Sequence, residues 1–252
     1  VKTMVTVEKV LNDIEKNQMA PVYLVLGEEQ VNAEKIKQKL IANFPEEERE
    51  FNIGIYDMEE VTLSTALADA MSVPFFGEKR LVFINRPYFL TGEAKKVKLE
   101  HDLDELIAYV NDPEPTTVLV LMAPYAKLDE RKKVVKQIKQ KAVVVDNSPL
   151  TEMAVRKHLS AELAQKGYTI DPRALEILLQ RTNTNLTAIA NELPKLLLVA
   201  EDKQITVNEV SAMVSRSLEQ NVFDLVELVL QKDTAKALEL YRDLLQQKEE
   251  PL

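Results

Sequence analysis

The feature that most constrains the fold is a series of five apolar segments that alternate with helical patterns in the first part of the chain. These segments are predicted strands, and they span Val22–Leu26, Phe51–Tyr56, Arg80–Asn85, Val118–Met122 and Ala142–Asp146. Strands that are apolar on both faces and separated by helices indicate a parallel sheet covered by helices on both sides. We therefore expect residues 1–149 to form a doubly wound α/β domain.

Helix punctuation replaces the strand pattern after Pro149. Asp171 precedes a proline at a first helical position, and Thr206 stands three residues before Glu209 in the spacing of a capping box. We therefore expect a small helical domain at residues 150–214. Residues 215–252 carry two more amphipathic helices, which are too short to form a domain by themselves. We expect a third helical domain to begin there and to extend past the last residue.

The first predicted strand ends at Gly27 and leads into a helix, which is the layout of a phosphate-binding loop. Such a loop continues with four residues and then a second glycine, a lysine and Ser or Thr. Asn32, Ala33 and Glu34 hold those three positions. The central strand that would end in magnesium-binding acids runs instead into Met122-Ala123-Pro124. We expect the frame of a nucleotide-binding fold without its function, and an ATPase with an unconventional site is the alternative.

Composition excludes several other kinds of site. The absence of cysteine excludes disulfides, thiolate metal ligands and thiol catalysis. His101 and His158 are far apart and are interpreted as solvated residues on helix surfaces, and no Gly-x-Ser-x-Gly nucleophile elbow is present. We therefore expect no catalytic residue, no metal and no cofactor. The net charge of −9 disfavours direct DNA binding, and no run of 18 apolar residues predicts a membrane span.

An aromatic pair stands on a connection that offers no periodic core position. Phe75 and Phe76 follow a predicted helix that ends near Met71, and they lie between Pro74 and Gly77. A single ring on such a connection folds back under the sheet easily, whereas two adjacent rings tend to point in different directions. We interpret the pair as an exposed binding hot spot, because aromatic rings offer a large apolar area at little cost in rotamer entropy.

Five segments are together much more specific than any one of them alone. They are the degenerate loop after Pro21–Leu24, the stretch Ala70–Val82, the charged run Lys127–Lys133, and the segments Asn185–Leu196 and Glu219–Leu225. In this order they resemble the delta subunits of bacterial DNA polymerase III clamp loaders, in the Gram-positive form. The resemblance covers nearly the whole chain.

The resemblance implies an architecture and a set of partners. It implies an AAA+ type domain at residues 1–149, a helical lid domain at 150–214 and the beginning of a helical collar domain at 215–252. Members of the family join three motor subunits (gamma or tau) and a delta-prime subunit in a ring that reaches primed DNA as an assembly. They do not hydrolyse ATP. The resemblance thus implies a cytoplasmic, non-catalytic subunit of the polymerase holoenzyme, without a cofactor and without membrane contact.

The resemblance also implies a role for the aromatic pair. The delta subunit binds the ring-shaped sliding clamp (the beta subunit) and opens one of its interfaces, so that the clamp can be loaded onto primed DNA. It does so by inserting two hydrophobic residues into a pocket on the clamp surface. Those two residues correspond to Phe75 and Phe76, with Met71, Val73 and Pro74 as their support.

Three interpretations stay open at this point. A delta-prime-like or other non-catalytic scaffold subunit of the same assembly is the alternative function, and it would make Phe75 and Phe76 core residues. Lys79 and Arg80 either contact an acidic clamp rim or are solvated at the edge of a strand. The run Lys127–Lys133 is interpreted as a solvated helix start, with DNA or a neighbouring subunit as the alternative.

Overall fold

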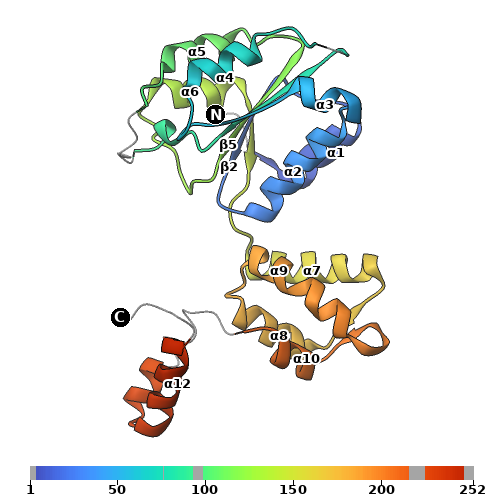
Figure 1. The fold of residues 1–252 in the computed structure, drawn as a ribbon, viewed down its shortest axis with the longest axis vertical. Coiled ribbons are helices and arrows are strands. Elements are labelled where there is room, and N and C mark those ends of the chain that lie inside the picture. The colour runs from blue at the N-terminus through green and yellow to red at the C-terminus, as the bar shows by residue number, and fades with distance from the viewer. Residues whose placement is uncertain (1–3, 76, 93–98, 216–224, 247–252) are drawn as a thin grey trace. The chain divides into compact units, whose positions relative to one another are not determined.

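The computed structural model describes residues 4–75, 77–92, 99–215 and 225–246. The chain divides into two compact units, Val1–Pro149 and Leu150–Leu252 (Figure 1). The first unit contains the large sheet, and the second is mainly helical. Within the described ranges, no helix has the length and apolar character that a membrane span requires.

A six-stranded parallel sheet forms the centre of the first unit, in the order β1-β6-β2-β5-β4-β3. The strands are β1 (Val5–Thr6), β2 (Val22–Leu26), β3 (Ile53–Asp57), β4 (Arg80–Asn85), β5 (Thr117–Ala123) and β6 (Val143–Asp146). The predicted parallel sheet is confirmed, and the short edge strand β1 is an addition. β3 begins later than predicted, because its pairing with β4 starts with Ile53 opposite Leu81.

Helices cover both faces of the sheet (Figure 1). On one side lie α1 (Val7–Glu15), α2 (Gln30–Ala42) and α3 (Glu46–Asn52), and on the other lie α4 (Leu63–Ala70), α5 (Leu103–Asn111) and α6 (Lys133–Lys141). All five residues of β2 are buried. Leu24 packs into the core under α4, α5 and α6, whereas Tyr23 and Val25 pack into the core under α1 and α2. This alternation is the reason that the strand is apolar on both faces.

The second unit is built mainly from helices, several of which have side-chain caps. They include α7 (Glu152–Lys166), α8 (Pro172–Arg181), α9 (Leu186–Val199), α10 (Val207–Met213) and α12 (Thr234–Gln246). Gly167 ends α7 with a φ of 75°, and Thr206 and Glu209 form the predicted capping box at the start of α10. A parallel pair of two-residue strands, β7 (Thr169–Ile170) and β8 (Gln204–Ile205), was not predicted, because strands this short leave no periodic pattern.

His101 has a structural role at the start of α4. The backbone N–H of Leu63 donates to its Nδ1 at 3.0 Å, and its Nε2 lies 3.1 Å from the carbonyl oxygen of Met58 and 2.9 Å from the hydroxyl of Tyr88. The expectation of a solvated histidine on a helix surface is therefore wrong for His101. Burial lowers its pKa, because the surroundings disfavour the charged ring.

We predict that His101 makes the stability of the first unit depend on pH. The unfolded chain takes up a proton at about pH 6.5, whereas the folded ring, with its lowered pKa, does so only at lower pH. The contribution of His101 to the free energy of unfolding should thus be fully present above pH 6.5 and should be lost as the pH drops towards the pKa of the folded state. Urea unfolding at pH 7.5 and 5.5 measures this loss. His101→Asn retains an acceptor that does not titrate, so equal pH dependence in the variant and the wild type would contradict the prediction.

Candidate functional site

The loop after β2 is closed by Asn147, which follows β6. The side-chain Nδ2 of Asn147 donates to the carbonyl oxygens of Gly27 (3.2 Å) and Glu29 (2.9 Å), and the N–H of Glu29 donates to the carbonyl of Asn147 at 3.1 Å. The N–H of Gly27 donates to the carbonyl of Ala123 at 3.1 Å. The N–H groups of Gly27 and Glu29 are therefore both bonded to carbonyl oxygens within the protein.

The three residues at the degenerate positions do not converge on a site. Asn32 is buried in α2, Ala33 lines a small cavity, and Glu34 is exposed to solvent. Gly27 is needed for packing, because a Cβ on it would lie 2.1 Å from the carbonyl carbon of Asn147 and its φ is 138°. This close approach of two backbones is sufficient to explain the glycine.

A cavity of about 250 Å³ is left at the carboxyl ends of the strands. Its lining includes Asp57, Arg86 and Met122. The Nε of Arg86 donates to Asp57 at 2.7 Å, and the guanidinium lies 3.1 Å from Glu59, so two carboxylates neutralise this cation. Among the residues with a described position, no three His, Asp or Glu side chains are grouped so that they could hold a metal. The cavity thus offers neither an unpaired cation for a phosphate nor ligands for a metal.

Several exposed apolar side chains of the first unit lie on or beside the connection between α4 and β4. Phe75 is 69% exposed, and its ring stacks on that of Phe51 with a centroid distance of 5.6 Å and an interplanar angle of 24°. Met71 and Val73 are also exposed, and Pro74 is half-buried. We call residues 71–75 together with Phe51 the aromatic element. Phe76, the second predicted anchor, lies outside the described residues.

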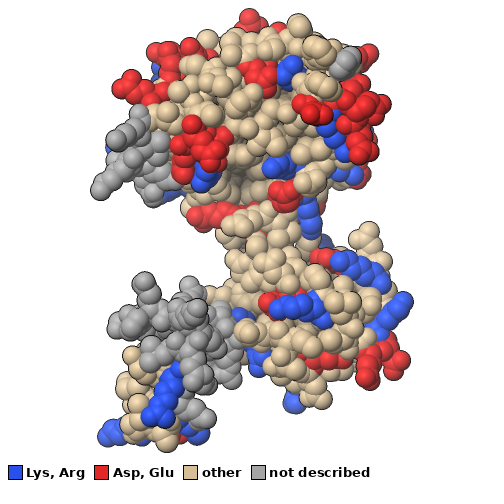
Figure 2. All heavy atoms as spheres, in the orientation of Figure 1, with Lys and Arg blue, Asp and Glu red and all other residues tan. Residues whose placement is uncertain are grey.

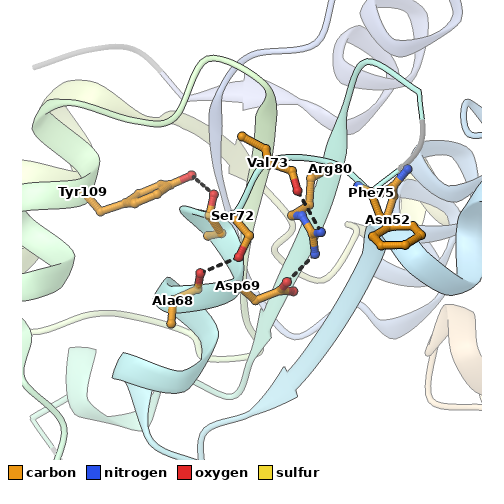
Figure 3. A network of polar contacts seen from close by, with 9 residues as sticks. Asn52, Ala68, Asp69, Ser72, Val73, Phe75, Arg80 and Tyr109 are labelled. Carbon is orange, nitrogen blue, oxygen red and sulfur yellow. Dashed lines mark hydrogen bonds and ion pairs between the residues drawn. The ribbon is translucent and has the colours of Figure 1, made fainter.

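Buried polar groups hold the backbone of the aromatic element (Figure 3). The Oδ1 of Asn52, which is fully buried, accepts the N–H of Phe75 at 2.9 Å. Arg80 forms an ion pair with Asp69 and donates to the carbonyl oxygen of Val73 at 3.2 Å. The exposed ring of Phe75 therefore stands on a connection that buried polar groups hold in place.

Two further bonds fix the turn that precedes the element. The hydroxyl of Ser72 donates to the carbonyl of Ala68 at 2.9 Å, and the hydroxyl of Tyr109 donates to the carbonyl of Ala70 at 3.5 Å. Burial raises the pKa of Tyr109 to about 12, so this hydroxyl keeps its proton at neutral pH. Figure 3 shows the Tyr109 side chain pointing towards this turn.

Arg80 does not have either of the roles expected from the sequence. It is only 8% exposed, and its guanidinium is used within the protein, so it is neither a contact to a clamp rim nor a solvated residue at a strand edge. The sequence does not reveal this role, because Asp69 and Arg80 lie on different elements and only the fold brings them together. Lys79, its neighbour, stays partly exposed.

Phe51 is the residue of the site that sequence reasoning missed. It was placed at the start of a strand, whereas it belongs to α3. A signal was present: Pro45 and the acidic run Glu46–Glu48 are typical of a helix start. On that helix, the positions three and four residues before Phe51 are glutamates, so its ring has no apolar face to join.

The charged run before α6 makes mostly local contacts. Arg131 donates to Asp129 at 2.9 Å, and this hydrogen bond lowers the pKa of Asp129 to about 2. Lys132 donates to the carbonyl oxygen of Phe89 at 2.8 Å. Lys127 and Lys133 are exposed. Their exposure agrees with a solvated helix start.

Comparison with known proteins gives matches along most of the chain. A family model described as "DNA polymerase III, delta subunit" matches residues 23–148, and one described as "DNA polymerase III delta subunit, C-terminal domain" matches residues 219–252. A model described as a middle domain matches residues 156–212. The three matched stretches follow one another without overlap.

Two relatives are similar over nearly the whole chain. DNA polymerase III subunit delta of Bacillus subtilis is 38% identical over 248 residues, which are 96% of this chain and 71% of the relative. The solved structure of the Bacillus subtilis DNA clamp loader delta protein (YqeN) superimposes with a TM-score of 0.69 at 37% identity, covering 97% of this chain and 73% of that one.

We predict that Gly27→Ala destabilises the first unit. The new Cβ collides with the carbonyl of Asn147, and L residues rarely adopt a φ of 138°. Strain of this kind costs about 2 kcal/mol or more. Urea unfolding measures the change, with Gly92→Ala as the control, because among the described atoms a Cβ there meets only the Asp129 carboxylate at an ordinary 3.7 Å. Equal stability of the two variants would show that the close approach does not matter.

We predict that Asp69→Asn destabilises the first unit strongly. The substitution leaves the buried Arg80 guanidinium without a charged partner, and breaking a buried pair costs about 3–5 kcal/mol. The partners are 10% and 18% exposed, which places the pair among the buried ones. Lys79→Met is the control, since it removes a neighbouring charge with an expected change below about 0.5 kcal/mol. A loss as small as that of the control would refute a structural role for the pair.

Proposed function

The chain belongs to the family of DNA polymerase III delta subunits, which are components of the clamp loader, and on this premise we propose that it binds a sliding clamp and opens it. In this proposal, the aromatic element enters an apolar pocket on the clamp. The chain itself does not hydrolyse ATP.

The observation that carries this proposal is the exposed stack of Phe75 on Phe51, fixed by buried polar groups. Exposed aromatic rings are typical of the few residues that contribute most of the binding energy of an interface. Because Asn52 and Arg80 already hold the backbone, little conformational entropy is lost on binding. The exposure of Phe75 also argues against the scaffold alternative, in which this ring would be a core residue.

The proposed mechanism is a shift of the clamp between closed and open states. Binding can shift this equilibrium only by the difference in affinity for the two states. The aromatic element must therefore fit the clamp better when one of its interfaces is open. ATP binding by the motor subunits would control when the element becomes accessible.

The closed loop supports the absence of ATP hydrolysis in this chain. The amides of Gly27 and Glu29 are bonded to other backbone groups. Ala33 stands at the position of the phosphate-binding lysine, and Met122 stands near the end of the strand that would carry the magnesium-binding acids. Energy for the cycle would come from partner subunits.

We propose the following division of labour among the parts of the chain. Residues 1–149 form the AAA+ like domain with the clamp-binding element, residues 150–214 a lid domain, and residues 215–252 the beginning of a collar domain. The last two would contact the gamma or tau motor subunits and delta-prime. The chain would meet primed DNA through this assembly, in the cytoplasm where the chromosome is replicated.

We predict that Phe75→Ala and Phe51→Ala each weaken binding to the cognate clamp. Truncation of a hot-spot aromatic residue costs about 2 kcal/mol, or about 30-fold in Kd. Isothermal titration calorimetry against purified clamp measures this loss, and Phe76→Ala tests the remaining predicted anchor. Leu198→Ala is the control, because Leu198 is 86% exposed but lies in the second unit. Wild-type affinity in a folded Phe75→Ala variant would refute the proposed function.

A further inference from the structure

We infer that a groove between the C-terminal parts of α4 and α5 is a second docking site, for a segment of the clamp that carries a Lys or Arg side chain next to apolar residues. This inference rests on the proposed function. It extends the proposed interface beyond the aromatic element and predicts that the facing surface of the clamp is positively charged.

The groove has an apolar floor that belongs to the protein core. It has a volume of about 600 Å³, and its apolar lining includes Leu67, Met71, Tyr109, Pro113 and Pro115. Leu67 and Tyr109 are buried and belong to the core, so the floor is fixed, while Met71 is exposed at the rim. We call this feature the α4–α5 groove. Its size suits one or two inserted side chains rather than a folded element.

Three carboxylates give the groove its charge. Glu105 and Asp112 are exposed, Glu114 is half-buried, and the described residues that line the groove include no Lys or Arg. None of the three forms an ion pair with any other residue whose position is described. Glu114 accepts hydrogen bonds from the N–H and the hydroxyl of Thr116 at 3.4 and 3.0 Å, which fixes its position. The groove is therefore an anionic, preformed surface. Acidic side chains also outnumber basic ones on the face of the first unit seen in Figure 2.

A cationic side chain with an apolar stem complements this surface. The methylene groups of Lys or Arg pack on apolar surface while the charged head reaches polar groups at the rim. The ring of Tyr109 would lie under the stem, and the carboxylates of Glu105 and Asp112 would meet the head. An anionic or purely apolar occupant would leave these carboxylates desolvated without a partner.

The required size of the interface and the position of Met71 identify the occupant as part of the clamp. A stable interface buries about 800 Å² on each partner, whereas one aromatic side chain contributes about 150–250 Å². Phe51 and Phe75 thus supply at most about 500 Å², and the remaining area must come from adjacent surface. Met71 belongs to both the aromatic element and the α4–α5 groove. A clamp that binds Phe75 would therefore also contact the groove, because Met71 borders both.

The test compares two triple variants with the same change in net charge. Glu105→Gln/Asp112→Asn/Glu114→Gln neutralises the groove, and Glu8→Gln/Glu28→Gln/Glu176→Gln removes three exposed carboxylates elsewhere. Calorimetry with the cognate clamp at 50 to 300 mM NaCl should show about tenfold weaker binding at low salt for the groove variant, with a flatter salt dependence. The control triple should retain the wild-type slope.

Two further variants keep the test decisive if Glu114→Gln disturbs folding. Glu105→Gln/Asp112→Asn changes only exposed side chains and should give a smaller loss in the same direction. Ala108→Lys places a cation in the groove from an exposed position of α5, and it should also weaken binding. Circular dichroism and thermal unfolding check that each variant is folded.

The outcomes separate this inference from the proposed function. Loss of binding in Phe75→Ala together with wild-type affinity and salt slope in every groove variant would overturn the groove alone. Wild-type affinity in Phe75→Ala would overturn the proposed function, whatever the groove variants do. Unchanged clamp binding with weaker assembly onto the motor subunits would assign the groove to a neighbouring subunit and overturn the inference.

Discussion

The buried ion pair between Arg80 and Asp69 is the interaction on which the position of the exposed aromatic element depends. Arg80 is the first residue of β4 and Asp69 lies in the last turn of α4, so the pair joins the two ends of the connection that carries Val73 and Phe75. Exposed apolar side chains gain little from one another in water and cannot fix their own backbone. Here a polar network beneath them does so, and the surface can stay apolar and ordered, as the proposed function requires.

The exposed aromatic element lies at the amino ends of the strands, whereas a sheet of this kind usually has its functional site at their carboxyl ends. Open α/β sheets bind ligands at the carboxyl ends of their strands, where this chain has the closed loop at Gly27 and the neutralised Arg86. The aromatic element precedes β4 and therefore lies at the amino end of that strand. The aromatic element is thus at the opposite end of the strands from the position where open α/β sheets bind ligands, and in the proposed function that end carries the protein contact.

Local patterns in the sequence predict much of the fold, but they do not show which residues that are distant in the chain contact one another. The strands are predictable because apolar residues such as Leu24 and Val25 follow one another and make both faces of a strand apolar. The exposure of Phe75 is predictable because its connection offers no core position. Arg80 and His101 were misjudged, since each is satisfied by groups that the fold brings to it, Asp69 and the N–H of Leu63. Phe51 was missed because a strand was assumed where an acidic helix ends.

The hydrogen bonds of Asn147 close the loop after β2 whatever side chains stand at positions 32, 33 and 34. Restoring glycine, lysine and threonine at positions 32, 33 and 34 would recreate the motif, but the amides of Gly27 and Glu29 would remain bonded to backbone carbonyls. The closure is held in part by Asn147, which follows β6 and lies 120 residues away from Gly27 in the chain. Substitutions at positions 32–34 therefore change the side chains of the loop without releasing these amides. The closed form of the loop is a property of the join between β2 and β6 and not of the loop sequence alone.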